Sequence, residues 1–489
     1  MKIKLIHTVS ILFLIVFFFA ECRKDSAVMK YGDFPTEIGK IITYKCATAG
    51  CHNSKSYQGA SGLDLTSFAS LFRGSNSGSS VIPFRSDFST FCNFINTYDD
   101  LGLKNTPTMP LNGNPLNREE VKLIKDWINN GAPDINGKIM WSDNPKRKKY
   151  YVLNQGCDVV TVFDAATQLP MRYITVGNKP GIPELPHMIR VSPDGQYWYV
   201  VFVANNILQK YRTSDDSKIG EVQLAHMLLP QQWNTIAISN DSKRAYCVSF
   251  DPGKSLLAVV DIENMRLIKP PFNAGNFINA HGVALNKTND TIYVTCQTGN
   301  YIYKMDTSLI DPPSSVVIDG TKFPNNGSSL DPHEIMFSED GSKYFVTCQK
   351  SNQVKVIQTA GDVLLKSIPT GKYPQEIARS NANNKIYVTC PEEPSPNPKA
   401  KGAVTVIDMI TYQYNNYLVG YLPHGIAIDE KNGWVIVASR NLDSNGPAPH
   451  HTSICGRNGF VNYFDIKTMT LLSKKTEVAS DPYSISITP

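Results

Sequence analysis

Two cysteines and a histidine lie within one run of seven residues. Cys46 and Cys51 are separated by four residues, and His52 follows directly. Two thiols this close can each form a thioether with a vinyl group of haem. A histidine just after the second thiol can then place its imidazole on the iron. The usual separation of the thiols is two residues, so this segment departs from it. The alternative is that Cys46 and Cys51 form a small disulfide loop.

A methionine further along the chain offers a second ligand for the same iron. Met109 lies in the string Thr-Pro-Thr-Met-Pro, residues 106–110. A thioether sulfur is a soft ligand, and methionine opposite histidine raises the potential of a haem. We therefore predict Met109 as the distal ligand. The alternative is that it is a core methionine.

Two predicted helices would position these residues. Residues 34–42 predict a short helix leading into the cysteine segment. A second helix begins after Asn117, which has the character of a cap with an acidic residue three positions later. Its apolar stripe indicates one buried face, and Gly131 ends it; the stripe consists of Val121, Ile124, Trp127 and Ile128.

Residues 34–135 resemble the small c-type cytochrome domains. The shared pattern is the cysteine pair with its histidine, a later Met-Pro, and a terminal helix ending in Trp-Ile-x-x-Gly-Ala-Pro, here residues 127–133. The resemblance implies one covalent haem c attached to Cys46 and Cys51. It further implies His52 as the proximal ligand, Met109 as the distal ligand, and single-electron exchange with a redox partner protein.

From residue 148 to residue 489 the sequence repeats a unit of four short strands. Residues 186–224 show one unit, with a Ser-Pro-Asp-Gly turn at residues 192–195. Seven such units predict a seven-bladed β-propeller. Residues 149–176 supply only three outer strands and residues 483–488 only an inner one. We therefore expect both ends to build one blade and close the ring. Residues 136–147 are predicted to be a polar linker.

A four-residue string recurs on the second strand of three units, as Tyr293–Cys296, Phe345–Cys348 and Tyr387–Cys390. It resembles the Tyr-Val-Thr-Asn repeat of a large family of bacterial propellers, with cysteine in place of asparagine. The resemblance implies the fold and says little about function. Equivalent positions on different blades are too far apart for a disulfide, so we expect buried free thiols.

Four histidines share one repeat position, just before the inner strand: His187, His281, His333 and His424. The long loop 441–458 is expected on the same face of the ring, and it contributes His450, His451 and Cys455. Together these side chains predict a metal site at the propeller mouth, with copper as the expected ion. Nitrous oxide reductase is similar in placing histidines near a propeller axis. The alternative is a structural role, copied with the repeat.

The N-terminus predicts export. Residues 1–21 combine a short basic start with a ten-residue apolar run, which is typical of a signal peptide. Cys22 follows, and the segment resembles a bacterial lipoprotein signal, although Glu21 departs from that pattern. We expect a periplasmic or cell-surface protein whose only membrane attachment is a lipid anchor on Cys22. The alternative is ordinary cleavage and a soluble periplasmic protein.

The predicted fold class is multidomain: a small all-α cytochrome c-like domain followed by an all-β seven-bladed propeller. A net charge of +5 over 489 residues, with no basic stripe, excludes nucleic acid as an expected partner. Three functions stay open. One is an electron carrier whose propeller docks a partner or holds a second site. Another is a periplasmic oxidoreductase with a metal at the propeller mouth, in which the haem passes electrons to or from that metal. Cytochrome-type nitrite reductases are similar in outline, although they have eight blades. The third is a cell-surface binding module.

Overall fold

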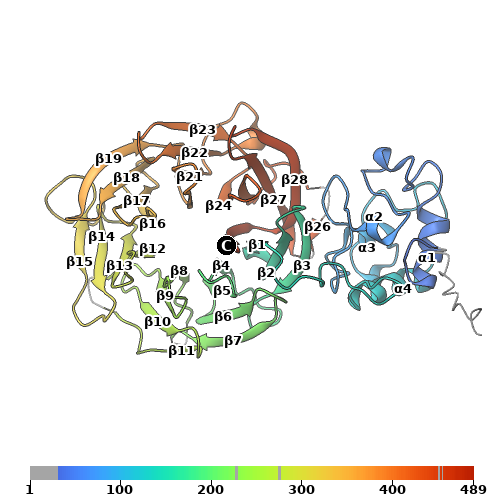
Figure 1. Cartoon of the computed structure of the whole chain (residues 1–489), viewed down its shortest axis with the longest axis horizontal. Coiled ribbons are helices and arrows are strands. Elements are labelled where there is room, and N and C mark those ends of the chain that lie inside the picture. Colours follow the sequence, from blue (N-terminus) through green and yellow to red (C-terminus); the bar gives the residue numbers. More distant parts are fainter. Residues whose placement is uncertain (1–30, 226–228, 274–276, 450–451, 454) are drawn as a thin grey trace, which may run out of the picture.

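The computed structural model describes residues 31–225, 229–273, 277–449, 452–453 and 455–489. The predicted signal peptide, Cys22, His450 and His451 lie outside the described residues. A helical region packs beside a ring of β-sheets, close to β3, β26 and β28 (Figure 1). Among the described helices, none has the length and apolar character needed to cross a bilayer.

The ring consists of seven sheets, which confirms the predicted seven-bladed propeller. Most sheets have four antiparallel strands, and one has five. Six blades are built in chain order, from β4 to β28. Their strands are β4 (Pro186–Val191), β5 (Tyr197–Phe202), β6 (Ile207–Arg212), β7 (Lys218–Gln223); β8 (Trp233–Ile238), β9 (Arg244–Ser249), β10 (Leu257–Asp261), β11 (Arg266–Leu267); β12 (Ala280–Leu285), β13 (Thr291–Cys296), β14 (Tyr301–Asp306), β15 (Ser314–Val317); β16 (Pro332–Phe337), β17 (Lys343–Cys348), β18 (Gln353–Gln358), β19 (Val363–Pro369); β20 (Ile377–Ser380), β21 (Lys385–Cys390), β22 (Ala403–Asp408), β23 (Tyr414–Leu418); and β24 (Pro423–Asp429), β25 (Trp434–Ser439), β26 (Thr452–Ser453), β27 (Gly456–Asp465), β28 (Leu471–Ser480).

The seventh blade joins the two ends of the propeller, as the sequence predicts. Its strands are β29 (Pro482–Ile487), β1 (Lys149–Asn154), β2 (Val159–Asp164) and β3 (Leu169–Thr175). The inner strand β29 pairs antiparallel with β1, with Val152 opposite Ile485. The C-terminus therefore lies near the centre of the ring (Figure 1). This pairing gives the three outer strands of the first unit their inner strand and so closes the ring.

The strands next to the inner strand of each blade are buried on both faces, because neighbouring blades stack on them. β13, β17 and β21 share one pattern, in which all residues after the first are buried. This explains why these strands are rich in aromatic and β-branched residues, which suit a pleated surface packed on both sides. Cys296, Cys348 and Cys390 are buried free thiols, as predicted.

The helical region contains four short α-helices and several turns. The elements are α1 (Thr36–Ile41), a π-helical turn at Ile42–Cys46, 3₁₀ turns at Tyr57–Gly59 and Asp99–Leu101, α2 (Phe68–Leu71), α3 (Thr90–Ile95) and α4 (Arg118–Asn129). Asn117 caps α4 in a reciprocal box with Glu120, as predicted. Gly131 follows with a φ of 95°, a conformation that glycine adopts without a steric penalty.

A separate all-α domain, which the sequence predicted, is not evident. One apolar cluster contains Phe34 and Trp127 of the helical region together with Tyr151 and Trp198 of the propeller. Trp141, in the expected linker, packs edge-on against Phe72 with ring centroids 5.4 Å apart. The two parts of the chain therefore share a core.

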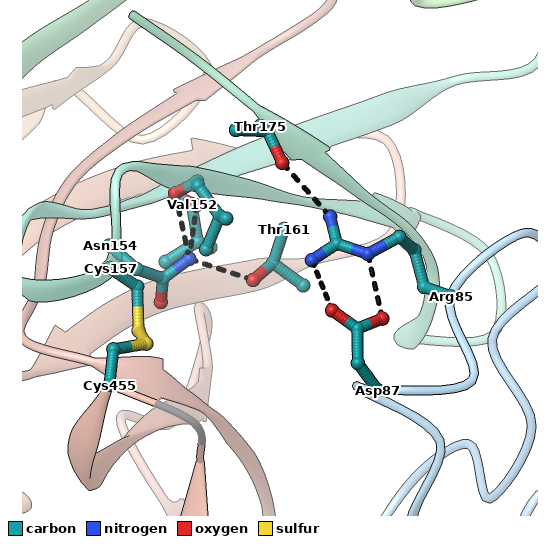
Figure 2. Close-up of a disulfide and its surroundings, with 9 residues drawn as sticks. Arg85, Asp87, Val152, Asn154, Cys157, Thr161, Thr175 and Cys455 are labelled. Carbon is teal, nitrogen blue, oxygen red and sulfur yellow. Dashed lines mark hydrogen bonds and ion pairs between the residues drawn. A yellow bond between two sulfur atoms is a disulfide. The ribbon is translucent and has the colours of Figure 1, made fainter. Parts of the chain in front are cut away.

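Strand β3 carries much of the contact between the two parts. The Phe88 ring stacks on Tyr173 with centroids 4.3 Å apart. The guanidinium of Arg85 donates to the Tyr173 carbonyl at 3.0 Å and to the Thr175 hydroxyl at 3.2 Å. Asp87 pairs with the same guanidinium at 2.7 Å and holds it in place (Figure 2). Arginine paired in this way holds a defined geometry across the boundary.

Candidate functional site

Cys46, Cys51 and His52 lie at the end of the first helix and in the loop that follows. Cys46 ends the π-helical turn and is buried, whereas Cys51 and His52 are half-buried. The backbone closes the loop, since the N–H of His52 donates to the Cys46 carbonyl at 3.2 Å. Both cysteines are free thiols, so the structure does not contain the small disulfide loop of the alternative interpretation. Burial raises the pKa of the Cys46 thiol to about 12.

The imidazole of His52 is oriented by a backbone carbonyl. Its Nδ1 lies 3.0 Å from the oxygen of Leu63. A carbonyl oxygen only accepts, so Nδ1 must carry the proton, and in the neutral ring Nε2 then holds a lone pair. Metal-binding histidines are oriented in this way, with one nitrogen hydrogen-bonded and the other facing the metal. His52 is therefore in the tautomer that a metal ligand needs.

Met109 packs against the apolar cluster that contains Cys46. Its N–H donates to the Phe94 carbonyl at 2.8 Å, which fixes the backbone at the residue. Five of the partly buried side chains that pack against the cluster, here called the apolar rim, are Ala47, Leu63, Tyr98, Leu101 and Met109. Cys46 is a member of the same apolar cluster that Met109 packs against, and Cys51 and His52 follow Cys46 within six residues of chain.

Helix α4 contacts the segment that carries Cys46. The ammonium of Lys45, next to Cys46, pairs with the Glu120 carboxylate at 2.6 Å. The indole N–H of Trp127 donates to the Pro133 carbonyl at 2.9 Å. That hydrogen bond joins the first and last residues of the Trp-Ile-x-x-Gly-Ala-Pro segment and closes it into a turn.

The structure also gathers the four repeated histidines, around the propeller axis. Their rings and that of Tyr483 form a closed circle, which we call the axial ring. Successive ring centroids are 6.1 Å apart for His187 and His281, 3.9 Å for His281 and His333, 6.4 Å for His333 and His424, 3.7 Å for His424 and Tyr483, and 4.3 Å for Tyr483 and His187.

A β-bulge places each of these rings. In β4, Pro186 pairs with Phe202 and Met188 with Val201, so His187 is an extra residue without a partner. The register shifts at the same point of the inner strand for His281, His333 and His424. A bulge inserts a residue and redirects its side chain away from the alternation of the strand. The axial ring is therefore a product of the strand geometry.

Three of the four imidazoles are held at Nδ1 and lack a partner at Nε2. Nδ1 of His187 lies 2.8 Å from the Gln155 amide, and Nδ1 of His333 lies 3.1 Å from the Gln297 amide. Nδ1 of His424 donates to the Tyr483 carbonyl at 2.9 Å. The Nε2 atoms of all three are buried without a hydrogen-bond partner. Burial lowers the pKa of each of these imidazoles well below its ordinary value, so all three are neutral.

Two carboxylates that the sequence analysis did not select lie beside the axial ring. Glu334 Oε1 is 3.4 Å from His281 Nδ1, and both atoms are buried without a hydrogen-bond partner. Glu376 is fully buried, and desolvation together with the nearby Glu334 raises its pKa to about 8. The sequence does contain a signal for them. Glu334 follows His333, and Glu376 follows Gln375, which occupies the position of the repeated histidines in the next repeat.

A central cavity of about 650 Å³ adjoins these carboxylates. Its wall combines apolar residues of the inner strands with charged groups, among them Glu334, Glu376 and Arg190. Arg190 approaches Glu376 to 3.8 Å. Two carboxylates of the inner-strand segments, Glu334 and Glu376, therefore form part of the wall of this cavity.

The predicted ligand Cys455 is corrected by the structure. Cys455 forms a disulfide with Cys157, which lies in the turn Gln155–Cys157 between β1 and β2 (Figure 2). A sulfur in a disulfide is not a thiolate, and only the thiolate binds metals. The disulfide joins the closing blade, formed by β29, β1, β2 and β3, to the blade that contains β24 to β28. His450 and His451 lie outside the described residues.

Comparisons with known proteins support the fold alone. No family model matches the chain, and no match to a curated protein is found. Among solved structures, a periplasmic gluconolactonase of Pseudomonas aeruginosa is 15% identical with a TM-score of 0.52, over 70% of this chain and 99% of that one. A functionally unknown protein of Desulfotomaculum acetoxidans is 15% identical with a TM-score of 0.50, over 69% and 98%. The class of protein is therefore a seven-bladed β-propeller with an additional N-terminal helical region.

Proposed function

We propose that this chain is an exported c-type cytochrome that transfers single electrons through one covalent haem in its helical region. The observation that carries the proposal is the hydrogen bond from His52 Nδ1 to the Leu63 carbonyl, 3.0 Å long, directly beside two free thiols. A histidine held through Nδ1 in this way presents its Nε2 atom to a ligand, which is the orientation of a metal-binding histidine. It has a clear role as an axial ligand.

The residues present fit a haem. Cys46 and Cys51 would form the two thioether bonds, and His52 and Met109 would be the two iron ligands. When bound, the haem iron would supply one-electron redox chemistry, and sulfur and nitrogen ligation is known to raise its potential. The apolar rim of Ala47, Leu63, Tyr98, Leu101 and Met109 would exclude water from the porphyrin. The wider spacing of the cysteines requires a longer loop, which the hydrogen bond from His52 N–H to the Cys46 carbonyl closes.

The propeller has a supporting role in this proposal. Because the helical region and the first blade share an apolar core, the haem would be held at a fixed position on the rim of the ring. A redox partner protein would approach the exposed side of the helical region. Export, with a lipid anchor on Cys22, would place the protein in the periplasm or at the cell surface.

Two methionines of the same cluster allow a matched test of the ligand set. Met109 and Met140 are both partly buried against the shared core. In full-length protein made with haem-maturation machinery, Met109→Ala should abolish the sulfur-to-iron charge-transfer band of the ferric form and lower the midpoint potential. Met140→Ala should leave both unchanged. A Met109→Ala spectrum identical to that of the wild type would contradict the distal assignment.

A further inference from the structure

The axial ring contains more unpaired ligand atoms than a packing role explains. Nε2 of His187, His333 and His424 and Nδ1 of His281 are buried without a hydrogen-bond partner. Leaving a buried polar group unsatisfied costs about 1–3 kcal/mol, and native structures leave few of them unpaired. Four such atoms on four different blades around one axis indicate a shared ligand.

Three donor groups of this set converge closely. Ligand atoms of His281, His333 and Glu334 all lie within 4.8 Å of one another, and the three residues are buried. Glu334 Oε1 lies 3.4 Å from His281 Nδ1 without a hydrogen bond between them, so each of the three residues contributes a buried atom that no hydrogen bond satisfies. Two imidazoles and one carboxylate form a ligand set that binds divalent first-row transition metals and leaves coordination positions open.

Groups behind the ring hold these donors in the orientation that a metal requires. The Gln297 amide contacts His333 Nδ1, and rotation of that amide exchanges its nitrogen for an oxygen that accepts the Nδ1 proton. Nε2 of His333 then carries the lone pair that can bind a metal ion. The hydroxyl of Thr295 donates to the His333 carbonyl at 2.8 Å and fixes the backbone of the bulge. Such supporting contacts are typical of metal sites, in which they set the tautomer and the orientation of each ring.

We propose that His281, His333 and Glu334 bind one divalent transition-metal ion on the propeller axis, with copper(II) bound most tightly, and that His187 and His424 complete its surroundings. Copper(II) has the highest affinity of the divalent first-row ions for nitrogen and oxygen donors. Glu334 also lines the central cavity, which connects the site with the channel. The inference is independent of the haem, because none of its residues belongs to the helical region.

Equilibrium dialysis of the full-length protein tests the site directly. The metal-stripped protein is dialysed against copper(II) or zinc(II), and copper, zinc and iron per chain are counted by mass spectrometry. We expect one equivalent of the added metal besides the haem iron. Glu334→Gln and His333→Gln should each weaken binding at least about 100-fold, since even supporting residues of metal sites contribute 10–100-fold. Asn234→Ala is the matched control, because Asn234 occupies the equivalent ring position of another blade and offers no imidazole.

Two results would overturn the proposal. One is wild-type protein that takes up neither metal in a stoichiometric amount. The other is uptake that persists in both variants, which would show adventitious attachment elsewhere. Glu334→Gln is nearly isosteric, and circular dichroism of the same samples verifies that the strands are intact. As a second measurement, copper(II) should raise the Tm of the wild type and of Asn234→Ala but not that of Glu334→Gln, because only the native site binds the ion.

Discussion

The hydroxyl of Thr389 donates a hydrogen bond of 2.7 Å to the carbonyl of His424 on the next blade. Thr347 makes the equivalent contact with Gln375 at 2.9 Å, and Thr295 with His333 at 2.8 Å. On these three blades the threonine of the repeated string therefore hydrogen-bonds the residue that the next blade contributes to the ring position. The repeated string and the ring position are therefore connected by hydrogen bonds between neighbouring blades.

Replacing Thr389 by valine should destabilise the propeller. Valine keeps the volume of threonine but removes the donor, so the buried carbonyl of His424 loses its partner. We expect the free energy of unfolding to fall by about 1–3 kcal/mol, as measured in urea. Thr36→Val, at the exposed first residue of α1, is the control and should change stability by less than about 0.5 kcal/mol. Equal stability of the two variants would contradict the role of the hydrogen bond.

Removing the disulfide should lower the stability of the propeller. Cys157 and Cys455 are separated by 298 residues, and a crosslink over such a long loop restricts the unfolded chain strongly. Cys157→Ser should lower the free energy of unfolding by about 3 kcal/mol. The double variant with Cys455→Ser should lose no more than the single one, because both changes break the same bond. Titration of the denatured wild type should find two additional thiols after reduction. Equal thiol counts before and after reduction would refute the pairing.

Buried thiols should make stability fall at alkaline pH. Burial raises the pKa of Cys348 and of Cys390 to about 12, from an ordinary value of 9.0. Below pH 9 both states keep these protons. Above it the unfolded thiols ionise while the native ones stay protonated, so the free energy of unfolding falls as pH rises towards 12. The expected slope is about 1.4 kcal/mol per pH unit for each thiol.

A double variant, Cys348→Ala with Cys390→Ala, isolates this contribution. Between pH 9 and 10.5 its free energy of unfolding should decline less steeply than that of the wild type, by about 2 kcal/mol per pH unit on average, because the unfolded thiols are half ionised at pH 9 and almost fully ionised at pH 10.5. The comparison of slopes is independent of any loss of packing caused by the smaller side chains, since that loss is the same at every pH. Parallel pH profiles would show that the native thiols ionise as readily as unfolded ones.

The sequence predicted the propeller and its closure because both follow from local patterns. Short alternating strands, Ser-Pro-Asp-Gly turns and a missing inner strand in the first unit are readable along the chain. The shared core was not predictable in the same way. Phe72 and Trp141 lie in segments without a periodic apolar pattern, and no local pattern connects them, although their rings are in contact.

The candidate sites were predictable only in part, for a similar reason. The four ring histidines recur at one repeat position, so the fold brought them together as their spacing implied. Glu334 was overlooked because no other ring histidine is followed by an acidic residue: Met188, Gly282 and Gly425 occupy that place. The partner of Cys455 lies almost the whole propeller away in sequence, and no local pattern connects it with Cys157.

The most direct measurement asks whether haem stays on the denatured polypeptide. The full-length protein is produced in a host that attaches c-type haem, unfolded, separated on a gel and stained for peroxidase activity of the haem. The account predicts one covalent haem per chain in the wild type, its loss in Cys46→Ala with Cys51→Ala, and its retention in Cys92→Ala, a buried free thiol of the same helical region. A wild-type polypeptide without pigment under these conditions would contradict the proposed function.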